Sequence, residues 1–402
     1  MANRKKLVDQ LKGVTRLAVE ATQKVTDIVE TMHHTIGGGP ELLGRPLEAV
    51  TRLLTAPTYG TIRGVTCAVG VGLDLLVSAF APLLDQAGAE RGPVLAALNG
   101  VVGDYLVETG NPLAIEMRLC SKGAPLELTQ DALRAAFPEG GRRLLVLVHG
   151  SSVDETQWSR KGHDHGVALA ADLGFVPLYL RYNSGLHISQ NGRAFAALLE
   201  QLVAAWPWPV EGLVLLAHSM GGLVARSACL LGEAQGHAWR RKLCTLVMLG
   251  CPHHGSPLER GGNWIDILLG ISRYSAPLAR LGKLRSAGVT DLRYGNVQDA
   301  HWEGRDRFAR EGDPRGALSL PAGVDCFAIA ATTATRSSGS LPGDGLVPVE
   351  SALGRHQDPA LSLDLAEAHR WIAWGTGHLS LLSSQDVYAK LLEWLKPAPQ
   401  AM

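Results

Sequence analysis

The sequence predicts an α/β protein built on a doubly wound, mostly parallel sheet. Short apolar runs recur between residues 144 and 376, as in parallel strands that are buried on both faces. Amphipathic helical patterns separate the first of these runs. In the stretch 212–224, an apolar run ends in His218-Ser219-Met220 and a helical pattern follows at once. This stretch indicates a strand, a sharp turn and a helix, in that order.

The composition fits one large domain with accessory segments. The chain has 402 residues, of which 46 are glycine and 46% are hydrophobic, as is typical of a loop-rich α/β protein. Its 38 basic and 38 acidic residues cancel, which gives no electrostatic case for a nucleic-acid partner. Six cysteines without a Cys-x-x-Cys pair indicate buried thiols in a reducing compartment. Because no signal-peptide pattern opens the chain, we expect a cytoplasmic protein.

Residues 1–110 predict an all-helical N-terminal extension. One apolar stripe, with steps of three and four residues, runs along a long amphipathic helix over 4–36: Leu7, Leu11, Val14, Ala18, Ala21, Val25, Ile28 and Met32. Three glycines and a proline at 37–40 end this helix, and a further helical pattern covers 93–107. Two interpretations of the stripe stay open. It docks on its own domain or on a second copy of the chain, or it lies on a membrane surface.

The segment Val65–Leu84 is the most apolar part of this extension. Its length would span a bilayer, but Asp74 lies at its centre, and a charge there costs about 3 kcal/mol on insertion scales. Gly70 and Gly72 lower its apolar total further. We therefore expect a buried or membrane-touching helix rather than a transmembrane span.

From Pro112 onward the pattern changes to strands and helices. Residues 114–129 predict a hairpin that turns around Ser121-Lys122-Gly123-Ala124. The later strands are predicted at 144–150, 176–182, 212–218, 243–250, 326–332 and 370–376, and the helices at 163–173, 189–205 and 221–234. The run LLVLVHGSS lacks both glycine-rich phosphate signatures, which argues against a mononucleotide-binding fold.

A long connection between two of these strands, 253–324, predicts a cap. About seventy residues are too many for a bare loop, and helical patterns occur at 263–270 and 277–284. An insertion at this point would cover the carboxyl edge of the sheet, where ligands bind in such folds. We therefore expect a helical extension at 1–110 and a catalytic domain at 111–402, with a cap at about 253–323.

Ser219 is the candidate nucleophile. A sharp strand-to-helix turn lifts a serine hydroxyl clear of the backbone, and it needs small residues two positions on either side. Ala217 and Gly221 fill these positions, although the usual signature has glycine first. The following helix points free backbone N–H groups at the serine. From the turn alone, a buried structural serine stays an alternative.

His378 and Asp344 are the candidate base and acid. A serine nucleophile needs a histidine to take its proton and a carboxylate to orient that histidine. His378 follows the last predicted strand, whereas the alternatives His301, His356 and His369 lie in the cap, in a polar loop and before that strand. Asp344 lies in a glycine-flanked loop beyond the strand 326–332, and Glu350 stays an alternative nearby.

Several segments together resemble the α/β-hydrolase family, in its bacterial lipase and esterase branch. They are VHGSS (148–152), AHSMGG (217–222), LGCPHHGSP (249–257), GDGLVPVESA (343–352) and GTGH (375–378). The resemblance extends over about residues 112–396 and implies the order nucleophile, acid, base. It implies Ser219, Asp344 and His378 as the catalytic triad. The backbone amides of Ser151 and Met220 would form the oxyanion hole.

The resemblance further implies a serine-dependent carboxylic ester hydrolase that works through an acyl-enzyme without any cofactor. An acyltransferase, a thioesterase or an amidase would use the same triad, and a non-catalytic, membrane-associated binding protein is the alternative from another class. A structural cation stays an alternative at the histidines, which are His163, His165, His253, His254 and His301. Six apolar residues would line an acyl pocket beneath the cap, which would suit a lipid-like or medium-chain ester, and positions in the core stay the alternative for them: Leu216, Leu268, Leu269, Ile271, Leu346 and Val347.

Overall fold

The computed structural model describes residues 91–108, 110–255, 286–306, 312–316, 319–336 and 341–396. The apolar stripe over 4–36, the segment Val65–Leu84 and the two helical patterns predicted in the cap lie outside these residues. The chain divides into two compact units, one made of 1–94 and 106–114, the other of 95–105 and 115–402. The second unit contains the sheet and all the candidate site residues.

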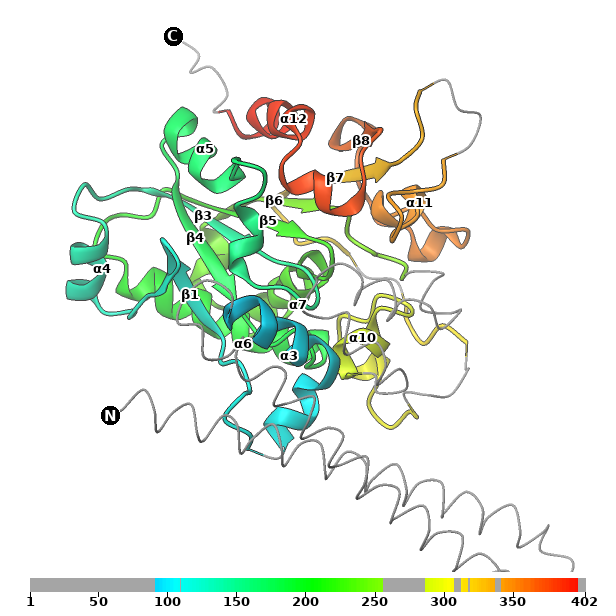
Figure 1. Ribbon diagram of the computed structural model, residues 1–402, viewed down its shortest axis with the longest axis horizontal. Helices are drawn as coiled ribbons and strands as arrows, with labels where there is room; N and C mark the ends of the chain where they lie inside the picture. Colours follow the sequence, from blue (N-terminus) through cyan, green and yellow to red (C-terminus); the bar gives the residue numbers. More distant parts are fainter. Residues whose placement is uncertain are drawn as a thin grey trace, which may run out of the picture. The chain divides into compact units, whose positions relative to one another are not determined.

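An eight-stranded sheet forms the centre of the second unit, with the strand order β2-β1-β4-β3-β5-β6-β7-β8 (Figure 1). The strands are β1 (Arg118–Ser121), β2 (Ala124–Pro125), β3 (Arg143–Val148), β4 (Val176–Arg181), β5 (Gly212–His218), β6 (Leu243–Leu249), β7 (Asp325–Thr332) and β8 (Arg370–Trp374). Strands β3 to β8 pair in parallel with one another, whereas β1 pairs in antiparallel fashion with both β2 and β4. The predicted mostly parallel sheet is confirmed.

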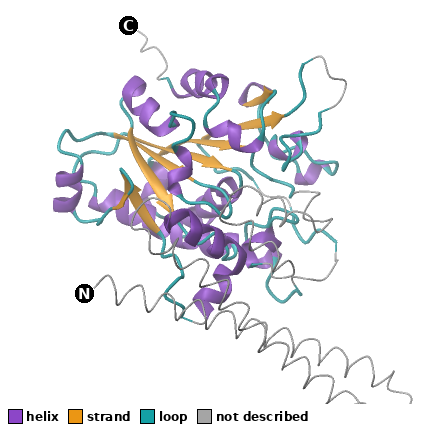
Figure 2. Ribbon diagram, in the orientation of Figure 1, coloured by secondary structure: helices purple, strands orange, loops and turns teal. Residues whose placement is uncertain are grey.

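Helices cover both faces of this sheet, as Figure 2 shows. The helices of the described residues are α3 (Arg91–Glu108), α4 (Gln130–Ala136), α5 (His165–Leu173), α6 (Ile188–Ala205), α7 (Met220–Ala234), α10 (Ala287–Asp291), α11 (Val349–Ala352) and α12 (Gln385–Leu395). Helices α5 and α12 share a buried apolar cluster with one face of the sheet, and α6 packs on α7 at the other. The helices predicted at 163–173, 189–205 and 221–234 are therefore confirmed, and the sheet is doubly wound.

Local sequence explains where these elements begin and end. Lys122 and Gly123 have φ values of 50° and 77°, as a two-residue hairpin turn requires, so the predicted hairpin is confirmed. Asp164 caps α5 by accepting the backbone N–H of Val167 at 3.0 Å, and Gly174 ends that helix with φ at 70°. Strand β5 is buried along nearly its whole length, because helices cover both of its faces.

The described cysteines are free thiols, and all are buried except Cys244, which is exposed near the start of β6. Cys244 therefore differs from the expectation of buried thiols. In the described part of the chain, no helix has both the length and the apolar content to cross a membrane.

Candidate active site

Ser219 stands alone between β5 and α7, where the strand turns into the helix. Its backbone has φ at 55° and ψ at −128°, a conformation that residues with side chains rarely adopt and that costs about 1–3 kcal/mol. Two backbone hydrogen bonds hold the turn: Ser219 N–H donates to Leu249 O at 2.8 Å, and Gly222 N–H donates to Ser219 O at 3.0 Å. Strain at a serine in this position is typical of a nucleophile elbow.

The residues on either side of Ser219 are small because the elbow packs against β3. A Cβ atom on Gly221 would lie 2.6 Å from Val148 O and 2.5 Å from His149 O, closer than a side chain allows. Ala217 is fully buried and pairs with Val148 and Met248 within the sheet. Glycine is therefore required at 221, whereas the single methyl of Ala217 is accommodated.

Asp344 and His378 form a buried pair, with Asp344 Oδ2 2.7 Å from His378 Nδ1. Their side chains are almost completely buried. The second carboxylate oxygen, Asp344 Oδ1, accepts the backbone N–H groups of Leu346 at 2.9 Å and Val347 at 2.7 Å. His378 N–H also donates to Asp344 O at 3.0 Å. Because the ring donates from Nδ1, its Nε2 atom is left to accept a proton.

His218 lies beside this pair and directly precedes Ser219 in the chain. Its Nε2 atom lies 3.2 Å from His378 O, and the two rings have centroids 4.7 Å apart. Burial, followed by the neighbouring His378, lowers the pKa of His218 well below its ordinary value, so the ring is neutral. Within the described residues, Ser219 Oγ forms no hydrogen bond with His378. Such catalytic contacts often tighten only when substrate is bound.

Gly250 brings the end of β6 against Asp344 and His378. Its φ is 56°, and a Cβ atom there would lie 3.2 Å from both Asp344 Oδ2 and His378 Nδ1. The same atom would lie 2.8 Å from Leu381 Cδ1. Gly250 N–H donates to Ile329 O at 2.8 Å, which joins β6 to β7 beside the site. Both the backbone conformation and the available space therefore require glycine.

Ser151 and Met220 place their backbone amides near Ser219. Met220 is the first residue of α7, and Ser151 follows Gly150, where a Cβ atom would lie 3.1 Å from Ser219 Cβ. Among the residues that the structure describes, no acceptor is hydrogen-bonded to either amide. Buried N–H groups without an acceptor are rare, and two of them beside a serine are what an oxyanion hole needs.

Three residues of the site had no role in the sequence prediction: His149, His218 and Gly250. Each lies at or just beyond the end of a predicted strand, which is the signal that points to them. His149 stacks on Tyr182 with ring centroids 4.3 Å apart, and its Nδ1–H donates to Gly150 O at 2.8 Å. Burial lowers the pKa of His149 to about 4, so this ring is neutral as well.

The alternative acids and bases lie elsewhere. Glu350 is exposed and pairs with Arg355 at 3.5 Å. His369 Nδ1 lies 3.0 Å from Cys326 O, near the start of β7 and therefore at the opposite end of the sheet from Asp344. His356 packs against the ring of His254.

The histidines considered for a cation contact other groups. His163 Nε2 lies 2.8 Å from His165 Nδ1, and His253 Nδ1 lies 3.3 Å from the guanidinium of Arg226. His301 is buried, and its Nδ1 accepts the backbone N–H of Val297. Within the described ranges, no three His, Cys, Asp or Glu side chains are grouped as a metal site would require.

The residues considered for an acyl pocket fall into three sets. Leu216 is a fully buried member of the core between the sheet, α5 and α12. Leu346 and Val347 are buried in the loop that holds the Asp344 carboxylate. Leu268, Leu269 and Ile271 lie outside the described residues.

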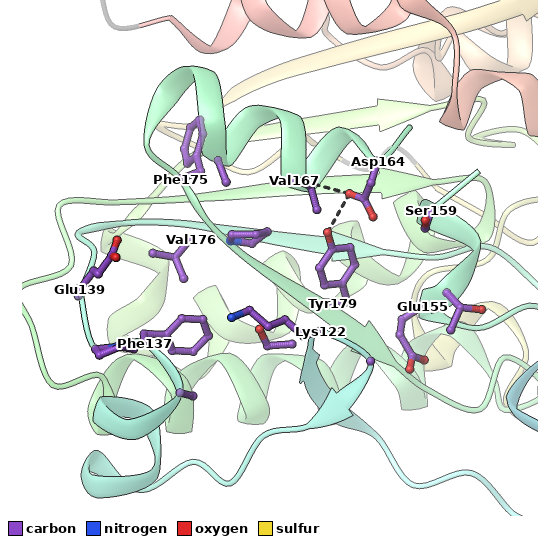
Figure 3. Close-up of a pocket in the computed structure, with 18 residues that line it drawn as sticks. Lys122, Phe137, Glu139, Glu155, Ser159, Asp164, Val167, Phe175, Val176 and Tyr179 are labelled. Atoms are coloured by element: carbon purple, nitrogen blue, oxygen red, sulfur yellow. Dashed lines mark hydrogen bonds between the residues drawn. The ribbon is translucent and has the colours of Figure 1, made fainter. Parts of the chain in front are cut away.

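A cavity of about 700 Å³ lies beside the β1–β2 hairpin (Figure 3). Phe137, Phe175 and Val176 contribute to its mainly apolar wall. On one side, Asp164 accepts hydrogen bonds from the hydroxyl of Tyr179 at 2.8 Å and from the backbone N–H that caps α5. None of the five candidate site residues lines this cavity, so it is not the acyl pocket predicted beneath the cap.

The sequence matches the family model described as PGAP1-like alpha/beta domain over residues 197–306, a range that includes the elbow. No curated protein shows significant similarity to the chain.

Several solved structures are similar to the chain at low sequence identity. The lipase BlEst2 from Bacillus licheniformis, in its mature form, is 17% identical with a TM-score of 0.42, and the match covers 70% of this chain and 97% of that one. An esterase from Thermogutta terrifontis is 16% identical with a TM-score of 0.38, over 64% of this chain and 90% of that one. The phospholipase PlaB from Legionella pneumophila is 18% identical with a TM-score of 0.34, over 53% and 46%.

Proposed function

We propose that this chain, an α/β-hydrolase by its fold, is a serine-dependent hydrolase of carboxylic esters, an esterase or lipase. One observation carries the proposal. Ser219 occupies a strained elbow at the end of β5, and the loops after β7 and β8 bring Asp344 and His378 together at 2.7 Å on the same edge of the sheet. A serine, a histidine and a buried carboxylate at one edge form the arrangement that nucleophilic acyl transfer needs.

The reaction has two halves. Ser219 Oγ attacks the carbonyl carbon of the ester, and its proton passes to His378 Nε2. The tetrahedral intermediate then re-forms its C=O bond and breaks the bond to the alcohol, which takes the proton from His378. Water attacks the acyl-enzyme by the same route, and the carboxylic acid leaves as Ser219 regains its proton.

Each neighbouring group stabilises charge that appears during these steps. The Asp344 carboxylate stabilises the imidazolium of His378 and keeps Nδ1 protonated. The negative oxygen of the intermediate would accept hydrogen bonds from the amides of Ser151 and Met220, at the positive end of the α7 dipole. The side chains and backbone amides supply every proton transfer and all the charge stabilisation in these steps, so the reaction needs no metal or organic cofactor.

We expect the acyl group to be apolar, as in a lipid-like or medium-chain ester. Leu346 and Val347 are buried next to Asp344, so the surroundings of the pair on this side are apolar. Burial of each further CH₂ group of an acyl chain is worth about 0.8 kcal/mol. A series of p-nitrophenyl esters with increasing acyl length should therefore show kcat/KM rising with length up to the limit of the pocket.

The decisive experiment compares Ser219→Ala with Ser227→Ala in the full-length protein. Both serines belong to the elbow and its helix and are buried, but Ser227 lies two turns further along α7. We expect Ser219→Ala to abolish ester hydrolysis and labelling by a serine-reactive phosphonate, and Ser227→Ala to retain both. Undiminished hydrolysis and labelling in Ser219→Ala would refute the proposal.

The same triad also serves acyltransferases, thioesterases and amidases, so the products must be identified. Wild-type protein is incubated with an ester in the presence of a competing alcohol or amine, and the products are separated. Free carboxylic acid as the main product is the expected result. A transferred acyl group as the main product would redirect the proposal to an acyltransferase.

A further inference from the structure

The middle of helix α3 lies directly on the turn that carries the proposed oxyanion donor Ser151. A Cβ atom on Gly100 would lie 2.1 Å from Ser152 Oγ and 2.7 Å from Ser152 Cα, so the helix backbone touches this turn without space for a side chain. Residues 95–105 of α3 belong to the same compact unit as the catalytic sheet. By sequence, the same residues fall within the segment predicted as a separate N-terminal extension.

Helix α3 is kinked where it makes this contact. Val102 has φ at −136° and ψ at 22°, which is not helical. The carbonyls around the kink accept hydrogen bonds from loops of the catalytic unit: Gly100 O from Ser286 Oγ at 2.6 Å, and Gly103 O from Asn183 Nδ2 at 2.9 Å. Side chains that insert at a kink in this way hold the helix at a defined position.

A second loop fits against the same part of α3. A Cβ atom on Gly185 would lie 2.1 Å from Asn99 O and 2.7 Å from Gly103 N, so this loop also approaches the helix backbone closely. Ser184, its neighbour, accepts the backbone N–H of Ser152 through Oγ at 2.9 Å. The helix, the loop and the turn therefore meet at Ser152.

Ser152 adopts a backbone conformation that needs such support. Its φ is 60°, in the left-handed region, where a residue with a Cβ atom costs roughly 1–2 kcal/mol. Strain of this kind persists only where the surroundings over-determine it. Since Ser151 directly precedes Ser152, the contacts that fix Ser152 also limit where the Ser151 amide can lie.

We propose that Gly100 is a positioning residue for the oxyanion turn, which contains Ser151 and Ser152. Residues 95–105 of α3 thereby help to hold the active site in place. Gly100 supports Ser152 from the side of the helix, and Ser184 holds its N–H from the side of the loop. The effect on catalysis rests on the proposed function, which assigns the Ser151 amide to the oxyanion hole. The contact between Gly100 and Ser152 does not depend on that function.

The test of the consequence is Gly100→Ala in the full-length protein. The added methyl must displace Ser152, and loss of one oxyanion donor typically lowers kcat by about 10²–10³-fold. For a displaced rather than deleted donor we expect kcat to fall about 10–100-fold, with KM changed less than about threefold, because the oxyanion exists only in the transition state.

Ser184→Ala tests the same turn without overpacking it. It removes only the hydroxyl that accepts the Ser152 N–H, so the protein should fold even if Gly100→Ala does not. We expect a smaller loss of kcat, about 3–10-fold, again without a matching rise in KM. A normal kcat in Ser184→Ala, together with a normal kcat in Gly100→Ala, would overturn the proposal.

Gly192→Ala is the matched control. Its new methyl would lie 2.3 Å from Ser227 Oγ, which creates the same glycine-to-serine clash between α6 and α7 instead of at the oxyanion turn. We expect a comparable loss of thermal stability but an unchanged kcat. If Gly192→Ala lowers kcat as much as Gly100→Ala, the effect is general destabilisation and the proposal fails.

Ser152→Gly in the Gly100→Ala background should restore part of kcat. Glycine removes Oγ and Cβ of Ser152, which the methyl meets at 2.1 and 2.7 Å, and it adopts the left-handed conformation at no steric cost. The Cα atom stays 2.7 Å from the methyl, so the recovery is partial. Failure of this double variant to exceed Gly100→Ala in kcat, with both proteins folded, would count against a contact through Ser152.

Hydrogen–deuterium exchange separates this inference from the proposed function. In Gly100→Ala, peptides covering residues 148–155 should exchange faster than in the wild type, whereas Gly192→Ala should leave them unchanged. If Ser219→Ala showed that the protein is not a serine hydrolase, the exchange result would still decide whether α3 holds the turn. Unchanged exchange in Gly100→Ala would overturn the contact itself.

Discussion

His165 Nε2 lies 2.9 Å from Leu381 O, which ties α5 to the short 3₁₀ turn that begins at His378. The other ring nitrogen, Nδ1, accepts a hydrogen bond from His163 Nε2 at 2.8 Å. His165 therefore donates to the backbone of the turn that carries the proposed base, and it does so from a fully buried position.

This relationship predicts that His165 positions His378. We expect His165→Leu to lower kcat about 3–10-fold, because Leu381 O loses its donor and the turn is held less firmly. His165→Gln carries an amide N–H at a similar reach and should retain most of the activity. Steady-state kinetics on both variants check this, and equal activity in the two would contradict a positioning role.

The same histidine predicts a pH dependence of stability. Burial lowers the pKa of His165 to about 4, whereas the unfolded residue titrates near 6.5. The unfolded state therefore binds the extra proton first, so this contribution is complete above about pH 6.5 and is lost as the pH falls towards 4, by about 3 kcal/mol.

Urea unfolding of the wild type and His165→Gln at pH 7, 5.5 and 4.5 measures this contribution. Other buried histidines act in the same direction in both proteins, so the difference between the two isolates His165. We expect the free energy of unfolding of His165→Gln to fall less steeply between pH 6.5 and 4. Parallel curves for the two proteins would contradict the prediction.

Gly250→Ala should damage both stability and activity. The new methyl meets Asp344, His378 and Leu381, and misplacement of catalytic groups by about 1 Å can cost about 100-fold in rate. Gly174→Ala is the control, because Gly174 also has a positive φ, at 70°, but no atom lies within 4 Å of its added Cβ. We expect both variants to lose about 1–2 kcal/mol from backbone strain.

Only Gly250→Ala should also lose most of its kcat, by about 100-fold. Thermal denaturation and ester hydrolysis are measured on the two purified variants. Equal kcat values for Gly250→Ala and Gly174→Ala would show that Gly250 is not needed to shape the pair.

Asp344→Asn tests which carboxylate is the acid. The amide oxygen can still accept the N–H groups of Leu346 and Val347, but it cannot stabilise a charged imidazole, so kcat should fall by about 10³–10⁴-fold. Glu350→Gln, on the exposed alternative, should leave kcat unchanged. A larger loss in Glu350→Gln than in Asp344→Asn would transfer the role to Glu350.

Much of the fold was predictable because local patterns encode it. A continuous apolar run such as Leu144–Val148 can be stable only with both faces covered, and this requirement predicts a buried parallel strand. The elbow was also predictable, because Ala217, Ser219 and Gly221 form a local pattern of small residues around a serine. The atoms that require glycine at 221 belong to Val148 and His149, which only the structure places there.

The sequence pointed to the residues of the candidate site, but not to the contacts that hold those residues in place. Ser219, Asp344 and His378 each follow the carboxyl end of a predicted parallel strand, so they were expected at the same edge of the sheet. From the sequence alone, Glu350 stayed an alternative to Asp344 as the acid. It lies only six residues further along the chain, and the direction of a side chain in a loop does not follow from the sequence. The structure places only Asp344 against His378.

By itself, the sequence determined the succession of strands and helices, the elbow at Ser219 and the edge of the sheet where chemistry is expected. Only the tertiary structure decided that Gly250 packs on Asp344 and His378, that His165 is hydrogen-bonded to the turn that begins at His378, and that Gly100 lies on the turn at Ser152. These contacts join residues that are far apart in the chain. Backbone propensity and hydrophobic period act over a few residues, so they carry no information about which distant surfaces meet.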